Sequence, residues 1–482
     1  MGTSYTDIST FGAIHQTLTT TFCSGATRSL AWRRKQLKEL YRMLEENEDA
    51  LCEALRLDLR KNRQESITSE IGVSRSEAAN AYKNLQSWAS KKNVSSNFAF
   101  KLDSCQIHRH PKGVVLIIGP WNYPVNLLVI PLIGAIAAGN CVLLKPSEIS
   151  FHTSSLLSRL IEKYLDTSAI RVINGGPEET SELLRFKFDH IFYTGNGRVG
   201  RVVMRAAAEY LTPVTLELGG KCPTYVAKDV DVAIAARRIA WGKFLNAGQT
   251  CIAPDYVICE KEIQEAFVSA LQDAFHEFFG GNDWKQSVSY GRIINEHHWD
   301  RLVRMLKGSK GRAVIGNEMD REDLFMAPTV VVDVQKDDRL MSEEIFGPLL
   351  PVVTVEGIQG AISIMNSFDP PLAIYVFSKN QHTVEHIQKQ TRAGALVSND
   401  CLLHFTINAL PFGGVGASGM GRYHGKHSFN EFSDHQASLS RGFSHLIEMA
   451  NSARYPPYTN GKLRYLAMLL FEKLNLTKKS SD

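Results

Sequence analysis

Two short segments of this sequence carry a nucleophile and a carboxylate that could act together. Residues 244–251 read Phe-Leu-Asn-Ala-Gly-Gln-Thr-Cys, so Cys251 follows a small, flexible Ala-Gly turn with polar neighbours. Upstream, Glu217 opens the run Glu-Leu-Gly-Gly-Lys at the end of an apolar stretch. A thiol and a lone carboxylate suit a nucleophile and its general base. Taken singly, each residue is more often structural, as a buried cysteine or a strand-end glutamate.

A glycine-rich turn follows a predicted strand at 190–193. Residues 195–200 read Gly-Asn-Gly-Arg-Val-Gly, a G-x-G-x-x-G pattern before a predicted helix over 201–210. Glycines at these positions let the backbone approach a pyrophosphate, and the helix N-terminus favours negative charge. The same fingerprint assigns an acidic residue about 20 positions later to a ribose, and here that residue is Glu217. One carboxylate cannot easily hold a ribose and act as a base, so the pattern alone leaves the role of Glu217 open.

Alternating strands and helices must position these segments. Hydrophobic periodicity predicts amphipathic helices over 28–60 and 67–92, and a core helix over 127–138. Buried strands are predicted at 114–118, 141–144, 169–173, 190–193 and 214–217, separated by helix-length intervals. This order predicts an α/β fold with a mostly parallel sheet, followed by a second α/β stretch over about 222–398.

The composition excludes several classes of protein. The chain has 482 residues, of which 44% are hydrophobic and 22% charged, as in an ordinary soluble globular protein. Its formal net charge is +4, and residues 441–482, with seven Lys/Arg and three Asp/Glu, account for all of it. The rest of the chain is neutral overall, so we expect no nucleic-acid partner.

The cysteines indicate a reducing compartment. Eight are spread over the chain and none forms a C-x-x-C pair, which predicts free thiols and no metal site. The N-terminus has no basic region followed by an apolar stretch, so no secretory signal is predicted. We therefore expect a cytoplasmic protein. Met1-Gly2 with Thr6 fits the myristoylation pattern literally, although the pattern is short and common.

Seven segments, in order, resemble the aldehyde dehydrogenase superfamily. They are Gly-Pro-Trp-Asn-Tyr-Pro at 119–124, Lys-Pro-Ser-Glu at 145–148, the glycine turn at 193–200, Leu-Glu-Leu-Gly-Gly-Lys at 216–221, Gly-Gln-Thr-Cys at 248–251, Glu-Glu-Ile-Phe-Gly-Pro at 343–348 and Pro-Phe-Gly-Gly-Val-Gly at 411–416. The first of these, and Tyr-His-Gly-Lys at 423–426, are similar to the class 3 branch, which includes fatty-aldehyde dehydrogenases. The resemblance covers about residues 10–440.

This resemblance implies a set of site residues. For catalysis it implies Cys251 as nucleophile, Glu217 as general base, and Asn122, with the Cys251 N–H, as the oxyanion hole. For the cofactor it implies Lys145 and Glu148 at the adenosine ribose, Glu344 at the nicotinamide ribose, Phe346 beside the ring, and Gly195, Asn196, Gly197, Arg198, Val199 and Gly200 against the dinucleotide. NAD is the expected cofactor because the carboxylate of Glu148 repels a 2′-phosphate, and NADP is the alternative.

The implied reaction is NAD(P)-dependent oxidation of an aldehyde, medium- or long-chain aliphatic or aromatic, to a carboxylic acid. Attack by Cys251 gives a thiohemiacetal, loss of hydride leaves a thioester, and Glu217 activates the water that hydrolyses it. A catalytically retired structural or binding protein on the same scaffold is one alternative, but Cys251, Glu217 and Asn122 are all present. An enzyme that passes the acyl group to coenzyme A is another, although that branch usually lacks the Glu-Leu-Gly-Gly base.

The resemblance also implies the architecture of the aldehyde dehydrogenase fold. A Rossmann-like NAD(P)-binding domain is expected from 1–88 and 110–217, and an α/β catalytic domain from 218–398. A small β arm at 89–109, with 399–440, is expected to bridge the subunits of a homodimer. Residues 441–482 remain as a basic, apolar tail.

The tail contains a continuously apolar stretch, Tyr465–Phe471. Basic residues flank it on both sides: Lys462, Arg464, Lys473, Lys478 and Lys479. It is too short to span a bilayer. One reading is a helix docked on the protein body or the dimer partner. The other is an interfacial helix that makes a peripheral membrane contact, which would place the enzyme on the cytosolic face of a membrane.

Overall fold

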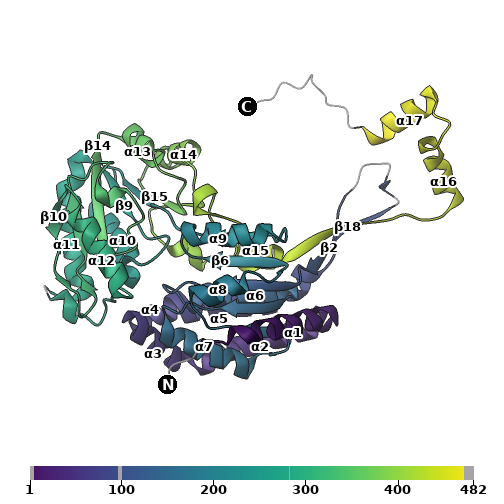
Figure 1. The fold of residues 1–482 in the computed structure, drawn as a ribbon. Coiled ribbons are helices and arrows are strands. Elements are labelled where there is room, and N and C mark those ends of the chain that lie inside the picture. Colours follow the sequence, from purple (N-terminus) through teal and green to yellow (C-terminus); the bar gives the residue numbers. More distant parts are fainter. Residues whose placement is uncertain (1–4, 96–99, 102, 282, 472–482) are drawn as a thin grey trace. The chain divides into compact units, whose positions relative to one another are not determined.

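The computed structural model describes residues 5–95, 100, 101, 103–281 and 283–471 (Figure 1). Contacts divide the chain into two compact units. Unit 1 comprises Met1–Leu85 and Pro111–Phe432, and unit 2 comprises Gln86–His110 and Ser433–Asp482. The finer domain limits predicted from the sequence stay a prediction.

The first sheet of unit 1 has six strands. In spatial order they are β17 (Gly419–Met420), β7 (Val214–Glu217), β6 (His190–Thr194), β3 (Val114–Ile118), β4 (Cys141–Lys145) and β5 (Ile170–Val172). All neighbours are parallel except β17 and β7. Every residue of β3, β4 and β6 is buried, because helices cover both faces of a doubly wound parallel sheet. The strand order reverses at β3, which is where such sheets bind ligands.

Helices α1, α6, α7 and α9 contact the strands of this sheet. The helices of this part of the chain are α1 (Phe11–Cys23), α2 (Leu30–Glu46), α3 (Glu48–Leu59), α4 (Arg63–Ser66), α5 (Gly72–Ala89), α6 (Asn126–Ala138), α7 (Phe151–Tyr164), α8 (Pro177–Leu183) and α9 (Gly197–Ala208). In Figure 1, α1, α2 and α7 lie together on one side and α9 lies on the other. The apolar stretch predicted as a core helix is α6, and all its residues are buried.

The first two predicted helices have different limits. The expected helix over 28–60 is broken at Asn47, whose φ of −118° and ψ of 22° are not helical. Glu48 and Asp49 then open α3, where their charges favour a helix start. The expected helix over 67–92 begins earlier, with α4 at Arg63, and runs through a π-helical turn, Ile67–Ile71, into α5.

The second sheet of unit 1 has seven strands and belongs to the second predicted α/β stretch. Its spatial order is β10 (Arg312–Ile315), β13 (Thr329–Val332), β14 (Leu349–Val355), β9 (Tyr256–Glu260), β8 (Pro223–Val226), β15 (Ala373–Phe377) and β16 (Ala395–Ser398). It is parallel except for β10. The remaining elements of unit 1 are α10 (Val232–Phe244), α11 (Gln264–Phe279), α12 (Glu296–Lys307), the hairpin β11 (Met319–Asp320) and β12 (Phe325–Met326), α13 (Ile358–Met365), α14 (Gln381–Gln390) and α15 (Gly425–Glu431).

Unit 2 is a small sheet followed by two helices. Its strands, in spatial order, are β1 (Lys92–Asn93), β2 (Ser104–Pro111) and β18 (Ser433–Ser440), and its helices are α16 (His445–Asn451) and α17 (Asn460–Leu470). Of the helices that the structure describes, none is long and apolar enough to cross a membrane. Gly2, Lys473, Lys478 and Lys479, which the sequence analysis singled out, lie outside the described residues.

Candidate active site

The predicted site residues gather at facing edges of the two sheets of unit 1. Asn122 follows β3, and Lys145 and Glu217 are the last residues of β4 and β7. The carboxyl ends of parallel strands share one edge of a sheet, so these residues lie along the same edge. Cys251 and Glu344 lie on segments that lead into β9 and β14, which are adjacent parallel strands. Residues 218–222 run directly from the end of β7 to the start of β8.

A left-handed turn presents Cys251. Asn246 and Ala247 have φ values of 54° and 51°, and Gly248 has a φ of 77°. A Cβ at Gly248 would lie 2.3 Å from the carbonyl oxygen of Gly347, so the close approach of the two segments requires glycine. Two consecutive non-glycine residues in this sparsely populated region, Asn246 and Ala247, indicate strain, which proteins retain where the surrounding structure and a function require it.

Side-chain hydrogen bonds join the Asn122 loop to the Cys251 loop. The buried side-chain amide of Asn122 donates to the carbonyl oxygen of Gln249 at 3.0 Å. Asn246 Nδ2 donates in return to the Asn122 carbonyl oxygen at 2.8 Å. The hydroxyls of Tyr123 and Thr250 are 2.8 Å apart. These contacts bring Asn122 close to the cysteine, as the resemblance implied.

Gln249 is a structural residue that the sequence reasoning did not assign. Its Nε2 donates to the carbonyl oxygens of Asn246 and Arg292 at 3.0 and 2.9 Å, and its Oε1 accepts the N–H of Ile294 at 3.0 Å. A fully buried amide with its hydrogen bonds satisfied rigidifies the turn before Cys251. The sequence could have pointed to Gln249, because this residue lies within the segment 244–251 that contains Cys251.

The thiol of Cys251 lies in surroundings that oppose its ionisation. Burial raises the pKa of Cys251, and the nearby carboxylates Glu344 and Glu217 raise it further. The N–H groups of Cys251 and Ile252 act in the opposite direction by hydrogen bonding to the sulfur. The polar neighbours of Cys251 do not offset these effects, so the thiol must transfer its proton to a base as it reacts.

Two buried carboxyl groups lie beside Cys251 and could accept that proton. Burial raises the pKa of Glu217 well above its usual value, and neither of its oxygens has a hydrogen-bond partner among the described residues. Burial raises the pKa of Glu344 to about 8, although the N–H of Gly220 hydrogen bonds to it. A Cβ at Gly219 would lie 2.2 Å from Glu344 Oε2. The glycines of the Glu-Leu-Gly-Gly run therefore make room for a second carboxylate.

Cys222 lies directly behind Cys251 and packs against its backbone. Its Sγ donates to the Cys251 carbonyl oxygen at 3.5 Å, and burial raises the pKa of Cys222 well above its usual value. A fully buried thiol with a raised pKa is inert. All eight cysteines of the chain are described, and each is a free thiol.

The glycine turn forms the N-terminus of a helix. Helix α9 begins at Gly197, whereas the sequence predicted its start at 201. Asn196 caps it, because its Oδ1 accepts the N–H of Val199 at 3.0 Å. Arg198, Val199 and Gly200 therefore belong to the first helical turn. Gly195 lies before the cap, and its N–H donates to the carbonyl oxygen of Glu217.

The donors along the first sheet's edge fit a dinucleotide. Lys145 Nζ and Glu148 Oε2 are 2.6 Å apart at the end of β4, and an ammonium beside a carboxylate can bind vicinal ribose hydroxyls. The start of α9 offers N–H groups and a positive dipole to a pyrophosphate. Phe346 has a φ of 50° and meets Trp121 edge-on, with ring centroids 5.4 Å apart. Among the described residues, no group of His, Cys, Asp or Glu could hold a metal ion.

A narrow, largely apolar pocket of about 40 Å³ opens onto Cys251. Its lining, apart from Cys251, consists of Tyr123, Asn126, Leu127, Leu245, Thr250, Ile252, Leu402, Phe405, Phe412, Tyr423 and His424. Burial lowers the pKa of His424 to about 3, so this imidazole is neutral at physiological pH. The pocket therefore presents no charged wall to a substrate.

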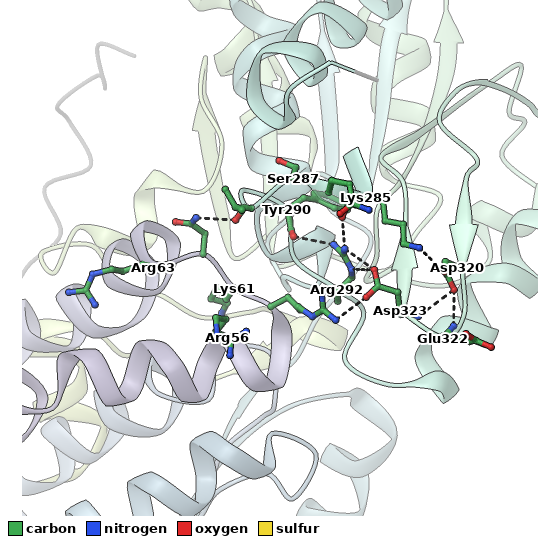
Figure 2. Close-up of a pocket in the computed structure, with 14 residues that line it drawn as sticks. Arg56, Lys61, Arg63, Lys285, Ser287, Tyr290, Arg292, Asp320, Glu322 and Asp323 are labelled. Carbon is green, nitrogen blue, oxygen red and sulfur yellow. Dashed lines mark hydrogen bonds and ion pairs between the residues drawn. The ribbon is translucent and has the colours of Figure 1, made fainter. Parts of the chain in front are cut away.

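A larger and strongly polar pocket, of about 670 Å³, lies between α3, α4 and the segments around Lys285 and Asp320 (Figure 2). Its cations are already engaged by acids. Arg292 and Arg60 pair with Asp323 at 2.8 and 2.9 Å, and Lys285 pairs with Asp320 at 2.6 Å. None of the predicted site residues lines it, whereas Cys251 lines the apolar pocket, which is therefore the candidate active site.

The sequence profile of the aldehyde dehydrogenase family matches residues 15–437. The chain belongs to the aldehyde dehydrogenase family. The resemblance predicted from the seven segments is therefore confirmed. The enzyme oxidises aldehydes with NAD(P) as its cofactor.

Named relatives place the enzyme near family 3. It is 50% identical over 455 residues to aldehyde dehydrogenase family 3 member B1 of Rattus norvegicus, with 94% of this chain and 96% of the relative covered. It is 46% identical over 457 residues to aldehyde dehydrogenase family 3 member A2 of Macaca fascicularis, with coverage of 95% and 93%. A solved substrate-bound state of Staphylococcus aureus AldH is 38% identical, with a TM-score of 0.91 and coverage of 95% and 98%. These matches confirm the predicted class 3 branch and the aldehyde dehydrogenase fold.

Proposed function

We propose that this aldehyde dehydrogenase oxidises medium- or long-chain aliphatic or aromatic aldehydes to carboxylic acids through a covalent intermediate on Cys251. The observation that carries the proposal is that Cys251 lines an apolar pocket and is close enough to the buried Glu217 for that carboxylate to raise its pKa. Glu217 has a raised pKa, and neither of its oxygens is bound within the described residues. When it is deprotonated, a carboxylate with a raised pKa and no hydrogen-bond partner takes a proton from water more readily than an ordinary one.

In this mechanism, Cys251 attacks the carbonyl carbon while its proton passes to a neighbouring carboxylate. The negative charge that develops on the aldehyde oxygen is stabilised by the side-chain amide of Asn122 and the N–H of Cys251. Loss of hydride from the resulting thiohemiacetal leaves a thioester on Cys251. Glu217 then deprotonates the water that hydrolyses the thioester and releases the acid.

The cofactor site follows the carboxyl edge of the first sheet. Lys145 and Glu148 would hold the adenosine ribose, residues 195–200 the dinucleotide, and Glu344 the nicotinamide ribose, with Phe346 beside the ring. An NAD(P)⁺ held by these residues would supply the acceptor for the hydride. Because the carboxylate of Glu148 disfavours a 2′-phosphate, we propose NAD as the preferred cofactor.

The chain length of the aldehyde tests the substrate class. We expect kcat/KM for straight-chain aldehydes to rise by about fourfold per methylene until the apolar pocket is filled, since each buried methylene contributes about 0.8 kcal/mol. Steady-state kinetics over an aldehyde series measures this. Phe405→Ser, in the pocket lining, should flatten the rise. Leu410→Ser, at an exposed position outside the lining, should preserve it. A flat profile in the unaltered enzyme would contradict the proposed substrate class.

The fate of the acyl group separates this proposal from transfer to coenzyme A. Glu217 is present, and neither of its oxygens has a hydrogen-bond partner among the described residues, which supports hydrolysis. Formation of free acid, with reduced cofactor appearing from aldehyde and water alone, supports the proposal. A requirement for coenzyme A would favour the alternative. We further propose a homodimer bridged by the 89–109 arm and residues 399–440.

The C-terminal helix supports a proposed location on the cytosolic face of a membrane. Helix α17 contains no buried residue, and Leu463, Met468 and Phe471 are exposed. An exposed apolar surface beside basic residues suits a bilayer interface with anionic lipid.

We expect the full chain to co-sediment with anionic vesicles and a truncation after Tyr458 to remain in the supernatant. Binding should weaken as salt rises, because each basic residue near the surface contributes about 1 kcal/mol. Met468→Glu, at a position on α17 that is 71% exposed, is the matched single change and should reduce sedimentation. Equal sedimentation of the full and truncated chains would mean that the tail is a docked structural helix.

A further inference from the structure

A buried ion pair lies directly beneath the Asn122 loop. Lys61 Nζ and Glu70 Oε1 are 2.6 Å apart, and both side chains are completely inaccessible to solvent. The Lys61 ammonium also lies over the ring of Tyr123, 4.2 Å from its centroid. No step of the proposed mechanism uses Lys61 or Glu70. Neither residue lies in any of the seven segments that resemble the aldehyde dehydrogenase superfamily.

Each member of the pair holds a different part of the Asn122 loop. Lys61 Nζ donates to the Asn122 carbonyl oxygen at 3.2 Å. Glu70 Oε2 accepts the N–H groups of Val125 and Asn126 at 2.9 and 3.1 Å. Those N–H groups belong to the first turn of α6, where a carboxylate is favoured by the helix dipole. The pair therefore clamps the loop at both ends, on either side of Pro124.

The local backbone of Glu70 is itself unusual. Glu70 lies in the π-helical turn Ile67–Ile71 between α4 and α5, and such turns are rare and often occur at functional sites. A Cβ on Gly72 would lie 2.7 Å from the carbonyl oxygen of Ile67. The glycine therefore accommodates the widened turn that brings the Glu70 carboxylate under the loop.

A buried ion pair usually contributes little to the stability of the folded protein. Removing two charges from water is expensive, and well-packed apolar residues of similar volume are often as stable or more so. The pair instead fixes the orientation of the Asn122 peptide group. Its carbonyl oxygen accepts two hydrogen bonds, one from Lys61 and one from Asn246. With the peptide fixed, Asn122 Nδ2 remains on the Cys251 side of the loop, bonded to the Gln249 carbonyl oxygen.

We propose that Lys61 and Glu70 are positioning residues that hold the Asn122 amide where the oxyanion forms. This inference rests on the proposed function of Asn122. Misplacing a donor that is preorganised for a transition state slows the reaction without weakening substrate binding. The pair should thus affect kcat and leave the KM for the aldehyde unchanged.

A double-mutant cycle tests the proposal on the full chain. The readout is the burst of p-nitrophenolate as p-nitrophenyl acetate acylates Cys251 without cofactor, with aldehyde oxidation as a second readout. We expect Asn122→Ala to slow acylation by about 10²–10³-fold and Lys61→Met by about 10-fold. In the combined variant, Lys61→Met should add less than about twofold to the effect of Asn122→Ala, because its effect passes through the same amide.

A matched control separates positioning from stability. Arg33 is also a buried cation, and it donates to the carbonyl oxygens of Thr27 and Ala137 at 3.2 Å, away from the site. Arg33→Met should lower Tm with unchanged acylation. Should Lys61→Met fail to fold, the same cycle is run with Glu70→Gln, which keeps an oxygen acceptor for the N–H groups of α6.

The outcomes are distinct. The positioning proposal would be overturned if Lys61→Met slowed acylation by the full 10-fold in the Asn122→Ala variant. It would also be overturned if Lys61→Met did not slow acylation in the otherwise unaltered enzyme. Normal acylation in Asn122→Ala alone would instead overturn the oxyanion role on which it rests. A drop in acylation for Arg33→Met equal to that for Lys61→Met would show that the effect follows stability.

Discussion

Replacing Cys251 by serine is expected to abolish aldehyde oxidation while cofactor still binds. A serine hydroxyl is a much weaker nucleophile than a thiol, and the buried carboxylates that already raise the pKa of the thiol oppose an alkoxide more strongly. Losses on removing a nucleophile reach about 10⁴-fold or more. None of the residues proposed to hold the cofactor is altered, so cofactor affinity should not change.

Two measurements check this expectation. The rate of formation of reduced cofactor gives turnover, and quenching of tryptophan fluorescence or calorimetry gives cofactor affinity. Cys222→Ser is the matched control, because Cys222 is buried and its Sγ donates to the Cys251 carbonyl oxygen. It should retain turnover. Persistent aldehyde oxidation in Cys251→Ser would show that Cys251 is not the nucleophile. The same conclusion would follow if Cys222→Ser lost activity while Cys251→Ser kept it.

The strands of the first sheet were predictable because each is a short, continuous apolar run. Strands β3 and β7 have the limits that the sequence predicted, and the others differ by one or two residues. Helix limits were less accurate where a polar residue acts as a cap. The break at Asn47 and the early start of α9 after Asn196 both depend on local backbone geometry, which hydrophobic periodicity does not report.

The candidate site was accessible from the sequence only through its motifs. Cys251, Glu217 and Asn122 stand in recognisable segments, and their roles remain predictions. The supporting residues Lys61 and Glu70 gave no such signal, because a single Lys or Glu in a helical pattern is normally a solvent-facing residue. Their burial arises from tertiary packing, because the π-helical turn that carries Glu70 contacts α6, and Lys61 lies in the connection between α3 and α4. The sequence also did not reveal that burial raises the pKa of Cys251. The pKa of a side chain depends on all the groups packed around it, which come from distant parts of the chain.

Replacement of Glu217 by glutamine is expected to separate the two halves of the reaction. An amide cannot take a proton from water, so hydrolysis of the thioester should slow by about 10²–10⁴-fold, the usual contribution of a general base. Hydride transfer should be slowed less. A single turnover should then give a burst of reduced cofactor, with the acyl group still attached to Cys251 and detectable by mass spectrometry.

The pH dependence should change in the same variant. Burial raises the pKa of Glu217, and a base acts only when deprotonated, so thioester hydrolysis in the unaltered enzyme should accelerate as pH rises through that raised pKa. Glu217→Gln should remove this dependence. Glu344→Gln is the matched control: it neutralises the other buried carboxylate beside Cys251, and because we place Glu344 at the nicotinamide ribose, it should slow hydride transfer and spare hydrolysis. If both steps were slowed equally by Glu217→Gln, with no burst, the carboxylate would serve the attack of Cys251 and not the activation of water.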